Sequence, residues 1–267
     1  MITSISALSE HLDGLPVHSV LAHKDRFVEG ARSLDLESAL VGELGRVRDD
    51  HRYPPPMRSS RALNISAGKW HFVDLFVFDD REFVDPLTTH PSDTVYYFLG
   101  DGEYVLHQLN EYDNGIFSRD SRAQLVESGR VSAGSTLAID ASRFIASFRS
   151  AAPLLALCLS NRRMKAFSWD FNLPDGEPRG HYNNYALYTI LEVMAKMIGN
   201  YGDADSVNAL KILLNHESDT IKWQAAFALL KISAAEGCQA FRLLARSGNP
   251  QLASSSNMAV TQIQGVL

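Results

Sequence analysis

The sequence predicts an α+β, multidomain chain: an antiparallel β-barrel with an N-terminal mixed or helical extension and a C-terminal α-solenoid-like helical domain. Three observations predict this order. Short β-branched and aromatic runs separated by turn residues fill residues 70–159. The tract Pro54-Pro55-Pro56 separates these runs from a stretch with helical spacing. After residue 180 the apolar residues recur at helical spacing and repeat themselves. We therefore expect three parts, residues 1–60, 61–180 and 181–267.

The composition excludes several classes of protein. Among 267 residues, 45% are hydrophobic and 21% are charged, which is typical of a globular chain and too apolar for a disordered one. A formal net charge of −6 leaves no basic excess, so we expect no nucleic-acid partner. No apolar run is long enough for a membrane span, and the first residues lack the positive charge of a secretory signal. Since Cys158 and Cys238 are the only cysteines, we expect a cytoplasmic protein without disulfides or membrane contact.

The N-terminal extension is expected to be helical in part. Its apolar residues are spaced for one or two short helices, and they are Phe27, Ala31, Leu34, Ala39, Leu40 and Leu44. The proline tract stops any helix and favours an extended path into the first long strand. Because no second proline cluster follows, a stiff connector is favoured over a ligand for a proline-binding domain.

Six short strands are expected in the middle part. They are Trp70–Phe78, Thr94–Leu99, Glu103–Leu109, Gly134–Asp140, Phe144–Phe148 and Leu154–Leu159. Asp101-Gly102 predicts a tight hairpin between the second and third of these strands. No helical pattern lies between the strands, so the region is typical of a sandwich or barrel and not of a parallel α/β sheet.

Five helices are expected in the last part, and they are Tyr182–Gly199, Ser206–His216, Thr220–Ala235, Cys238–Arg246 and Leu252–Gln264. Asp203, Asp219 and Asn249 stand near their starts as candidate caps. A shift of 31 residues aligns Ile190 with Ile221 and Leu252. Such a period, built from helix pairs, is typical of an α-solenoid.

The stretch from Asp203 to Leu229 resembles a HEAT-like repeat of the phycobilisome-lyase type. Repeats of this kind mostly present surfaces to other proteins. The resemblance therefore implies a protein partner or a homo-oligomer that forms through the helical repeats.

Two segments of the middle part resemble the cupin superfamily. The first, Thr88 to Gly100, keeps six residues between the acid Asp93 and the glycine, and His90 precedes that acid. The second, Gly134 to Phe148, matches the family's glycine, strand, turn and returning strand, with Ile145 at the place of a metal-binding histidine. The resemblance implies a cupin-like barrel that acts on a small molecule, with a divalent metal, Fe(II) among the candidates, as cofactor.

Three histidines of the barrel region are the candidate metal ligands. His71 and His107 lie on apolar faces of expected strands, so both are expected to point inward, beside His90. A three-histidine site suits non-haem iron or zinc with open positions for oxygen or substrate. Asp93 is the catalytic candidate, as a further ligand or as support for one. Alternatively, the histidines are core or rim residues bonded to tyrosine or backbone groups.

Three further residues are candidates for substrate binding. Arg119 and Arg143 could hold a carboxylate or phosphate with bidentate geometry, and Arg143 lies at a turn near the expected barrel mouth. Tyr97 belongs to an aromatic set that would line a ligand pocket or simply fill the barrel, and that set is Tyr96, Tyr97, Phe98 and Tyr104. Solvated or ion-paired arginines are the alternative explanation for the two basic residues.

Three functions follow from these candidates. The cupin resemblance implies a non-haem metal-dependent oxygenase that acts on a small polar or acidic substrate. A metal-free barrel that binds or senses a small molecule is the second. The third is a scaffold whose helical repeats dock a partner protein. Metal content, ligand binding and partner capture by residues 200–267 distinguish the three.

Overall fold

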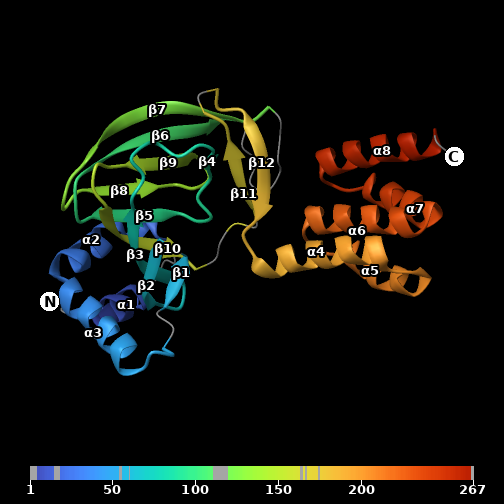
Figure 1. Ribbon diagram of the computed structural model, residues 1–267. Helices are drawn as coiled ribbons and strands as arrows, with labels where there is room; N and C mark the ends of the chain where they lie inside the picture. Colours follow the sequence, from blue (N-terminus) through green and yellow to red (C-terminus); the bar gives the residue numbers. More distant parts are fainter. Residues whose placement is uncertain are drawn as a thin grey trace. The chain divides into compact units, whose positions relative to one another are not determined.

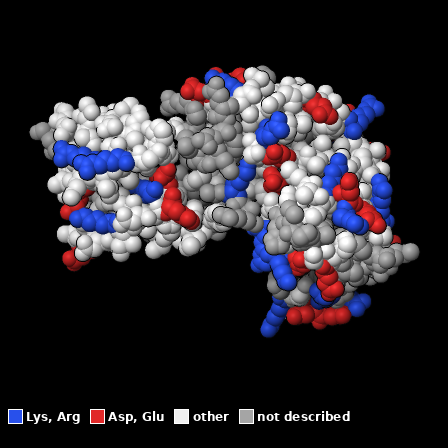
Figure 2. Space-filling model, turned by 180° about the vertical axis from the view of Figure 1, so that it is seen from behind, with Lys and Arg blue, Asp and Glu red and all other residues white. Residues whose placement is uncertain are grey.

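The computed structural model describes residues 5–14, 19–53, 56–59, 61–110, 120–162, 165, 167–173 and 175–265. Contacts divide the chain into two compact units, Met1–His181 and Tyr182–Leu267 (Figure 1). The first unit combines helices with antiparallel sheets and the second is helical, so the α+β class is confirmed. None of the described helices has both the length and the apolar character that crossing a membrane requires. On the face shown in Figure 2, basic and acidic side chains are interspersed.

Three helices begin the first unit, and they are α1 (Ile5–Asp13), α2 (Lys24–Ser33) and α3 (Leu36–Asp49). The expected one or two helices around Phe27 and Leu44 are confirmed as α2 and α3. The carboxylate of Asp35 starts α3 by accepting a hydrogen bond from the Ser38 backbone N–H at 3.0 Å. The sequence did not predict α1, whose Leu8 and Leu12 are fully buried.

Three antiparallel sheets form the rest of the described part of this unit. Sheet A has the strand order β1-β2-β3-β10-β5-β8, sheet B the order β12-β11-β4 and sheet C the order β7-β6-β9. The strands are β1 (Met57–Ser59), β2 (Ala62–Ala67), β3 (His71–Phe78), β4 (Leu87–Thr88), β5 (Thr94–Phe98), β6 (Gly102–Asn110), β7 (Arg122–Val131), β8 (Thr136–Ile139), β9 (Phe144–Arg149), β10 (Leu154–Asn161), β11 (Phe167–Phe171) and β12 (Pro178–Asn183). The six expected strands are confirmed as β3, β5, β6, β8, β9 and β10.

Sheet A is buried on both faces. Its outer face, with Val73 and Leu157, packs against the N-terminal helices. Its inner face, with Tyr96 and Cys158, packs against sheet C. Strand β10 lies in the middle of sheet A, between β3 and β5. A central strand covered on both faces explains why Leu154–Leu159 is apolar without alternation.

The predicted hairpin at Asp101-Gly102 is wrong. Strand β5 pairs with β10 and β8, whereas β6 pairs with β7 and β9. The turn therefore carries the chain from sheet A to sheet C. Gly102 lies in a close approach there, because a Cβ at this position would lie 2.8 Å from Leu154 Cδ2 and 3.1 Å from the Arg149 carbonyl oxygen.

The second unit contains the five expected helices, with bounds that differ by a few residues. They are α4 (Ala186–Tyr201), α5 (Val207–Leu213), α6 (Asp219–Ile232), α7 (Ala234–Leu244) and α8 (Pro250–Gln264). Alanine and leucine side chains from these helices form one core, in which Ala195, Ala226 and Leu229 are fully buried. Helix α4 approaches α6 closely, since a Cβ on Gly199 would lie 2.8 Å from the Ala228 Cβ.

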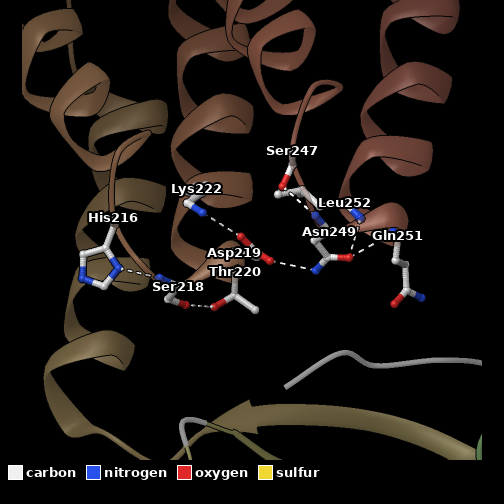
Figure 3. Close-up of polar contacts among 9 residues, drawn as sticks. All are labelled: His216, Ser218, Asp219, Thr220, Lys222, Ser247, Asn249, Gln251 and Leu252. Atoms are coloured by element: carbon white, nitrogen blue, oxygen red, sulfur yellow. Dashed lines mark hydrogen bonds and ion pairs between the residues drawn. The ribbon is translucent and has the colours of Figure 1, made fainter. Parts of the chain in front are cut away.

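Two of the predicted capping residues connect the starts of α6 and α8 (Figure 3). The cap is confirmed for Asn249, whereas Ser218 and not Asp219 is the N-cap of α6. Asn249 is the N-cap of α8, and its side-chain oxygen accepts from the backbone N–H groups of Gln251 and Leu252 at 3.0 and 3.3 Å. Its amide nitrogen donates to Asp219 Oδ2, at the first residue of α6, at 2.7 Å. Lys222 Nζ donates to the other oxygen of Asp219 at 2.8 Å. The starts of α6 and α8 are therefore bonded to each other.

Candidate functional site

A cavity of about 170 Å³ opens in the first unit beside strands β4 and β9. Three aromatic rings form much of its wall. The centroid of the Phe148 ring lies 4.7 Å from that of Phe78 and 5.2 Å from that of Tyr96. The lining residues are Arg61, Phe78, Asp80, Val84, Pro86, Leu87, Thr88, His90, Tyr96, Ile145, Ala146, Ser147 and Phe148. Most of this surface is apolar.

The charged groups that line the cavity form an ion pair. Arg61 donates to the two carboxylate oxygens of Asp80 at 2.5 and 3.0 Å, and it lies 3.4 Å from Asp79. Asp80 raises the pKa of Arg61 further above its ordinary value. The carboxylate neutralises the charge of a guanidinium group that is held in this bidentate way. The described walls of the cavity therefore offer a neutral surface to a ligand.

His90 is the one metal-ligand candidate that lines this cavity. Its Nε2 accepts a hydrogen bond from the Ala146 backbone N–H at 3.1 Å, so the neutral ring carries its proton on Nδ1. Burial lowers the pKa of His90 to about 4, and the nearby charge of Lys165 acts in the same direction. At neutral pH His90 is an uncharged hydrogen-bond donor, and its Nε2 lone pair is occupied.

A row of polar side chains crosses the inner face of sheet A, and sequence reasoning missed it. Asp74, Cys158 and Tyr96 are cross-strand neighbours on β3, β10 and β5, and all three are buried. Asn64 Nδ2 donates to Asp74 Oδ1 at 2.7 Å. Burial, together with the charges of Cys158 and Asp74, raises the pKa of Tyr96 well above its ordinary value. The phenol at the cavity wall therefore stays protonated. The available signal was Asp74, a charged residue inside a strongly apolar strand.

His71 lies on the opposite face of sheet A, so its predicted position in the barrel interior is wrong. Its Nε2 lies 3.3 Å from Ser9 Oγ and its Nδ1 lies 3.4 Å from Asp13 Oδ1, and both partners belong to α1. Burial lowers the pKa of His71, while the charge of Asp13 opposes this shift. The apolar face that the alternation of β3 revealed is covered by the N-terminal helices.

Ser9, His71 and Asp13 lie in the order of a catalytic triad, in which a histidine base activates a serine nucleophile. However, Ser9 is only 8% exposed and lies in the contact between α1 and β3. Asp13 also accepts a hydrogen bond from the Lys69 backbone N–H at 2.8 Å. These contacts hold α1 on the sheet, and we assign the three residues to the fold.

His107 is buried, but it lies on the other face of β6 from the one that packs on sheet A. Leu106 shares the interior with Tyr96, whereas His107 pairs across the strands with Ile145. Ile145 belongs to a second core together with Trp169 and Phe171. Burial lowers the pKa of His107. His107 is therefore buried, as expected, but beside a different core from the one that contains Tyr96.

Asp93 and Tyr97 do not line the cavity. The Asp93 Oδ1 accepts a hydrogen bond from the Ala141 backbone N–H at 3.0 Å and thereby ties the start of β5 to the turn after β8. Tyr97 faces the N-terminal helices with Val73 and Leu157, so its predicted position as a barrel-lining substrate contact is wrong. Its neighbour Tyr96 takes the inward position because successive side chains alternate along a strand.

The two predicted arginines do not form an anion site in the described structure. Arg143 is exposed at the turn before β9, and its guanidinium carbon lies 5.3 Å from the centroid of the Phe144 ring. It is not among the residues around the cavity. Arg119 lies outside the described residues.

The described donor groups of this unit are not arranged to hold a metal ion. Across the described ranges, no group of three His, Cys, Asp or Glu side chains is placed to hold one. His71 bonds to α1, His107 belongs to the second core, and His90 has committed its Nε2 to the backbone. The three histidines of the expected metal site are therefore not brought together in the described residues.

Comparison with known proteins finds solved structures that are similar to part of this chain. No family model matches the sequence, and no curated protein is significantly similar to it. Among solved structures, hydroquinone 1,2-dioxygenase from a Sphingomonas species, with 4-hydroxybenzoate bound, is similar over 40% of this chain and 68% of its own. That similarity has 10% sequence identity and a TM-score of 0.32.

Two cupin proteins are similar to a comparable degree. A cupin superfamily protein from Desulfitobacterium hafniense matches 41% of this chain and 91% of its own, with 18% identity and a TM-score of 0.25. A cupin 2 barrel-domain protein from Leptotrichia buccalis matches 49% of each chain, with 16% identity and a TM-score of 0.27. Likenesses this partial and distant carry no conclusion about activity, ligand or metal.

Proposed function

We propose that the first unit is a metal-free binding barrel for a small, neutral ring compound. The observation that supports this most is the cavity beside His90, with its volume of about 170 Å³ and its three aromatic walls. An apolar cavity of about 150 Å³ is large enough to bind benzene. The paired charges of Arg61 and Asp80 favour an uncharged ligand over the acidic substrate that the sequence suggested.

Two donors would orient the ligand in this cavity. His90 carries a proton on Nδ1, and Tyr96 keeps its phenol proton because its pKa is raised. A hydroxyl or carbonyl oxygen on the ring compound would accept from one of them, while the ring would pack against Phe78 and Phe148. Phenol and benzyl alcohol are suitable probes, with benzoate as the charged comparison.

Replacing Val84 by tryptophan tests this proposal. Val84 lines the cavity and is 43% exposed, so a larger side chain can fill the opening without displacing the core. We expect calorimetric titration to show saturable binding of phenol to the unaltered protein, and Val84→Trp to weaken it by at least about tenfold, which corresponds to about 1.4 kcal/mol. Benzoate is expected to bind more weakly than phenol to the unaltered protein.

Val126→Trp is the matched control. Val126 is 49% exposed on β7 and does not line the cavity, so this variant is expected to bind phenol normally. Treatment with a chelator is also expected to leave binding unchanged, since the donors around the cavity do not fit a metal. Absence of saturable binding in the unaltered protein, or equal binding by the two tryptophan variants, would contradict the proposal.

The metal-dependent oxygenase stays a prediction. It requires a metal ion held by residues other than the three histidines first considered. Metal analysis of protein purified without an affinity metal tests it directly. Stoichiometric iron, zinc or manganese that returns after removal would support the oxygenase and count against the metal-free barrel.

For the second unit, we propose a helical-repeat array. Three side-chain contacts join residues 29 to 31 positions apart: Tyr188 with Glu217, Asp219 with Asn249, and Asn200 with Lys231. Contacts at nearly the same separation are expected where equivalent helices of successive repeats stack on each other. The substitution Asn200→Ala removes one of these contacts, in which Lys231 Nζ donates to the Asn200 side-chain oxygen at 2.7 Å.

A further inference from the structure

Helix α4 carries a wide apolar face that the rest of its own unit leaves uncovered. Six large apolar residues on this helix are between 48% and 87% exposed, and they are Leu187, Ile190, Val193, Met194, Met197 and Tyr201. Their spacing places them on one side of the helix. The charged residues of α4 are Glu192 and Lys196, and helical geometry puts both near the opposite side. An uncharged face of this size on a surface helix is typical of an interaction site.

The internal repeat shows which face of α6 corresponds to this face of α4. A shift of 31 residues takes Ile190, Met194 and Met197 to Ile221, Ala225 and Ala228 on α6. On α6 these positions are 0%, 0% and 3% exposed, and Ala228 lies directly against Gly199 of α4. The face of α6 that packs on the preceding helix is therefore the equivalent of the open face of α4.

Two of these three positions are buried again on α8, whereas the third, Ala259, is partly buried. Another shift of 31 residues reaches Leu252 and Ser256 on α8, which are 7% and 0% exposed. Helix α4 is the first of the series and has no preceding helix within its unit. It also has methionine where α6 has alanine, and flexible methionine side chains suit a surface that packs against a separate chain.

We propose that this face of α4 is a two-fold interface, and that its occupant is the α4 face of a second copy of the same chain. In a two-fold contact the same patch meets itself, so any charge on the patch would bring a second like charge into the same contact. The face carries no charge, which makes it self-complementary.

The exposed area also fits a dimer. If each of these side chains has a surface on the order of 150–250 Å², six residues exposed to this degree present roughly 500–900 Å². Two such faces would together bury about 1,000–1,800 Å², a range that overlaps that of specific interfaces. The proposal is independent of the ligand cavity in the first unit.

Sedimentation analysis of the full chain tests the interface. We expect the unaltered protein to be a dimer that dissociates on dilution in the micromolar range. Met194→Glu would place two like charges in the contact and is expected to give a monomer. Met197→Lys should have the same effect with the opposite charge. Both positions are half exposed, so helix content measured by circular dichroism should be unchanged.

Met258→Glu is the matched control, because Met258 lies on α8 and is 59% exposed. This variant is expected to remain a dimer. A monomeric unaltered protein at high micromolar concentration would overturn the proposal, and so would a dimer that survives both α4 substitutions. Loss of the dimer in Met258→Glu as well would place the contact elsewhere and would also overturn it.

Discussion

Replacing Trp169 by alanine is expected to lower the free energy of unfolding of the first unit by about 3–5 kcal/mol. Trp169 is the largest of the fully buried side chains described, and it packs with Leu87, Leu109 and Ile145 in the second core. Its removal loses the transfer free energy of an indole ring. It also leaves a void that β4 and β11 cannot close, since the backbones of Thr89 and Trp169 remain bonded to each other.

The measurement can be confined to the first unit. The chain has three tryptophans, and Trp223 reports on the second unit. In a Trp223→Phe background, Trp70 follows denaturant unfolding of the first unit in both the parent and the Trp169→Ala variant. Leu125→Ala, at a residue that is 60% exposed, serves as the control and should change stability by less than about 0.5 kcal/mol. A similar small change for Trp169→Ala would contradict the assigned core.

Acid is expected to destabilise the first unit through His90. In the folded protein the pKa of His90 is about 4, whereas the ordinary value is 6.5. Between these values the unfolded chain binds a proton that the folded protein does not, so stability falls as the pH drops from 6.5 toward 4. Above pH 6.5 the neutral His90 ring makes its full contribution to the stability of the folded state. Below about pH 4 no further stability is lost through this residue. The shift corresponds to about 3 kcal/mol, an upper value because the ring is partly exposed.

His90→Gln separates this contribution from the others. A glutamine side chain can accept from the Ala146 N–H without titrating. Denaturant unfolding at neutral pH and near pH 4 should therefore show a smaller loss of stability in the variant than in the parent. Burial also lowers the pKa values of His71 and His107, so part of the loss is expected to remain in His90→Gln. An identical loss in both proteins would exclude His90 as its source.

The sequence predicted the positions of the helices and strands better than it predicted which strands pair with each other. Periodicity located β3, β5, β10 and the helices of the second unit, because alternation and helical spacing are local properties. Pairing is not local. Asp101-Gly102 has turn chemistry that suits a hairpin, yet the turn joins two different sheets.

The site was harder to predict than the fold for a related reason. An apolar strand face indicates burial without saying what covers it. His71 therefore seemed to face the barrel interior, while α1, which the sequence did not reveal, covers that face. Adjacent strand residues face opposite ways, so only one of Tyr96 and Tyr97 can line the cavity. The alternation alone does not say which one. Asp74 stands out as a charged residue in an apolar strand, but its position beside Cys158 follows only when β3 is paired with β10, about eighty residues away.

The central position of β10 has a consequence for synthesis of the chain. Strands β3 and β5 emerge from the ribosome first, and neither can pair with the other because residues 154–161 belong between them. Until residues 154–161 are synthesised, the edges of β3 and β5 that pair with β10 have no partner strand. Unpaired edges of this kind are prone to aggregation during folding. We expect ribosome-bound chains that end before residue 154 to be protease-sensitive and those that end well beyond residue 181 to be protected.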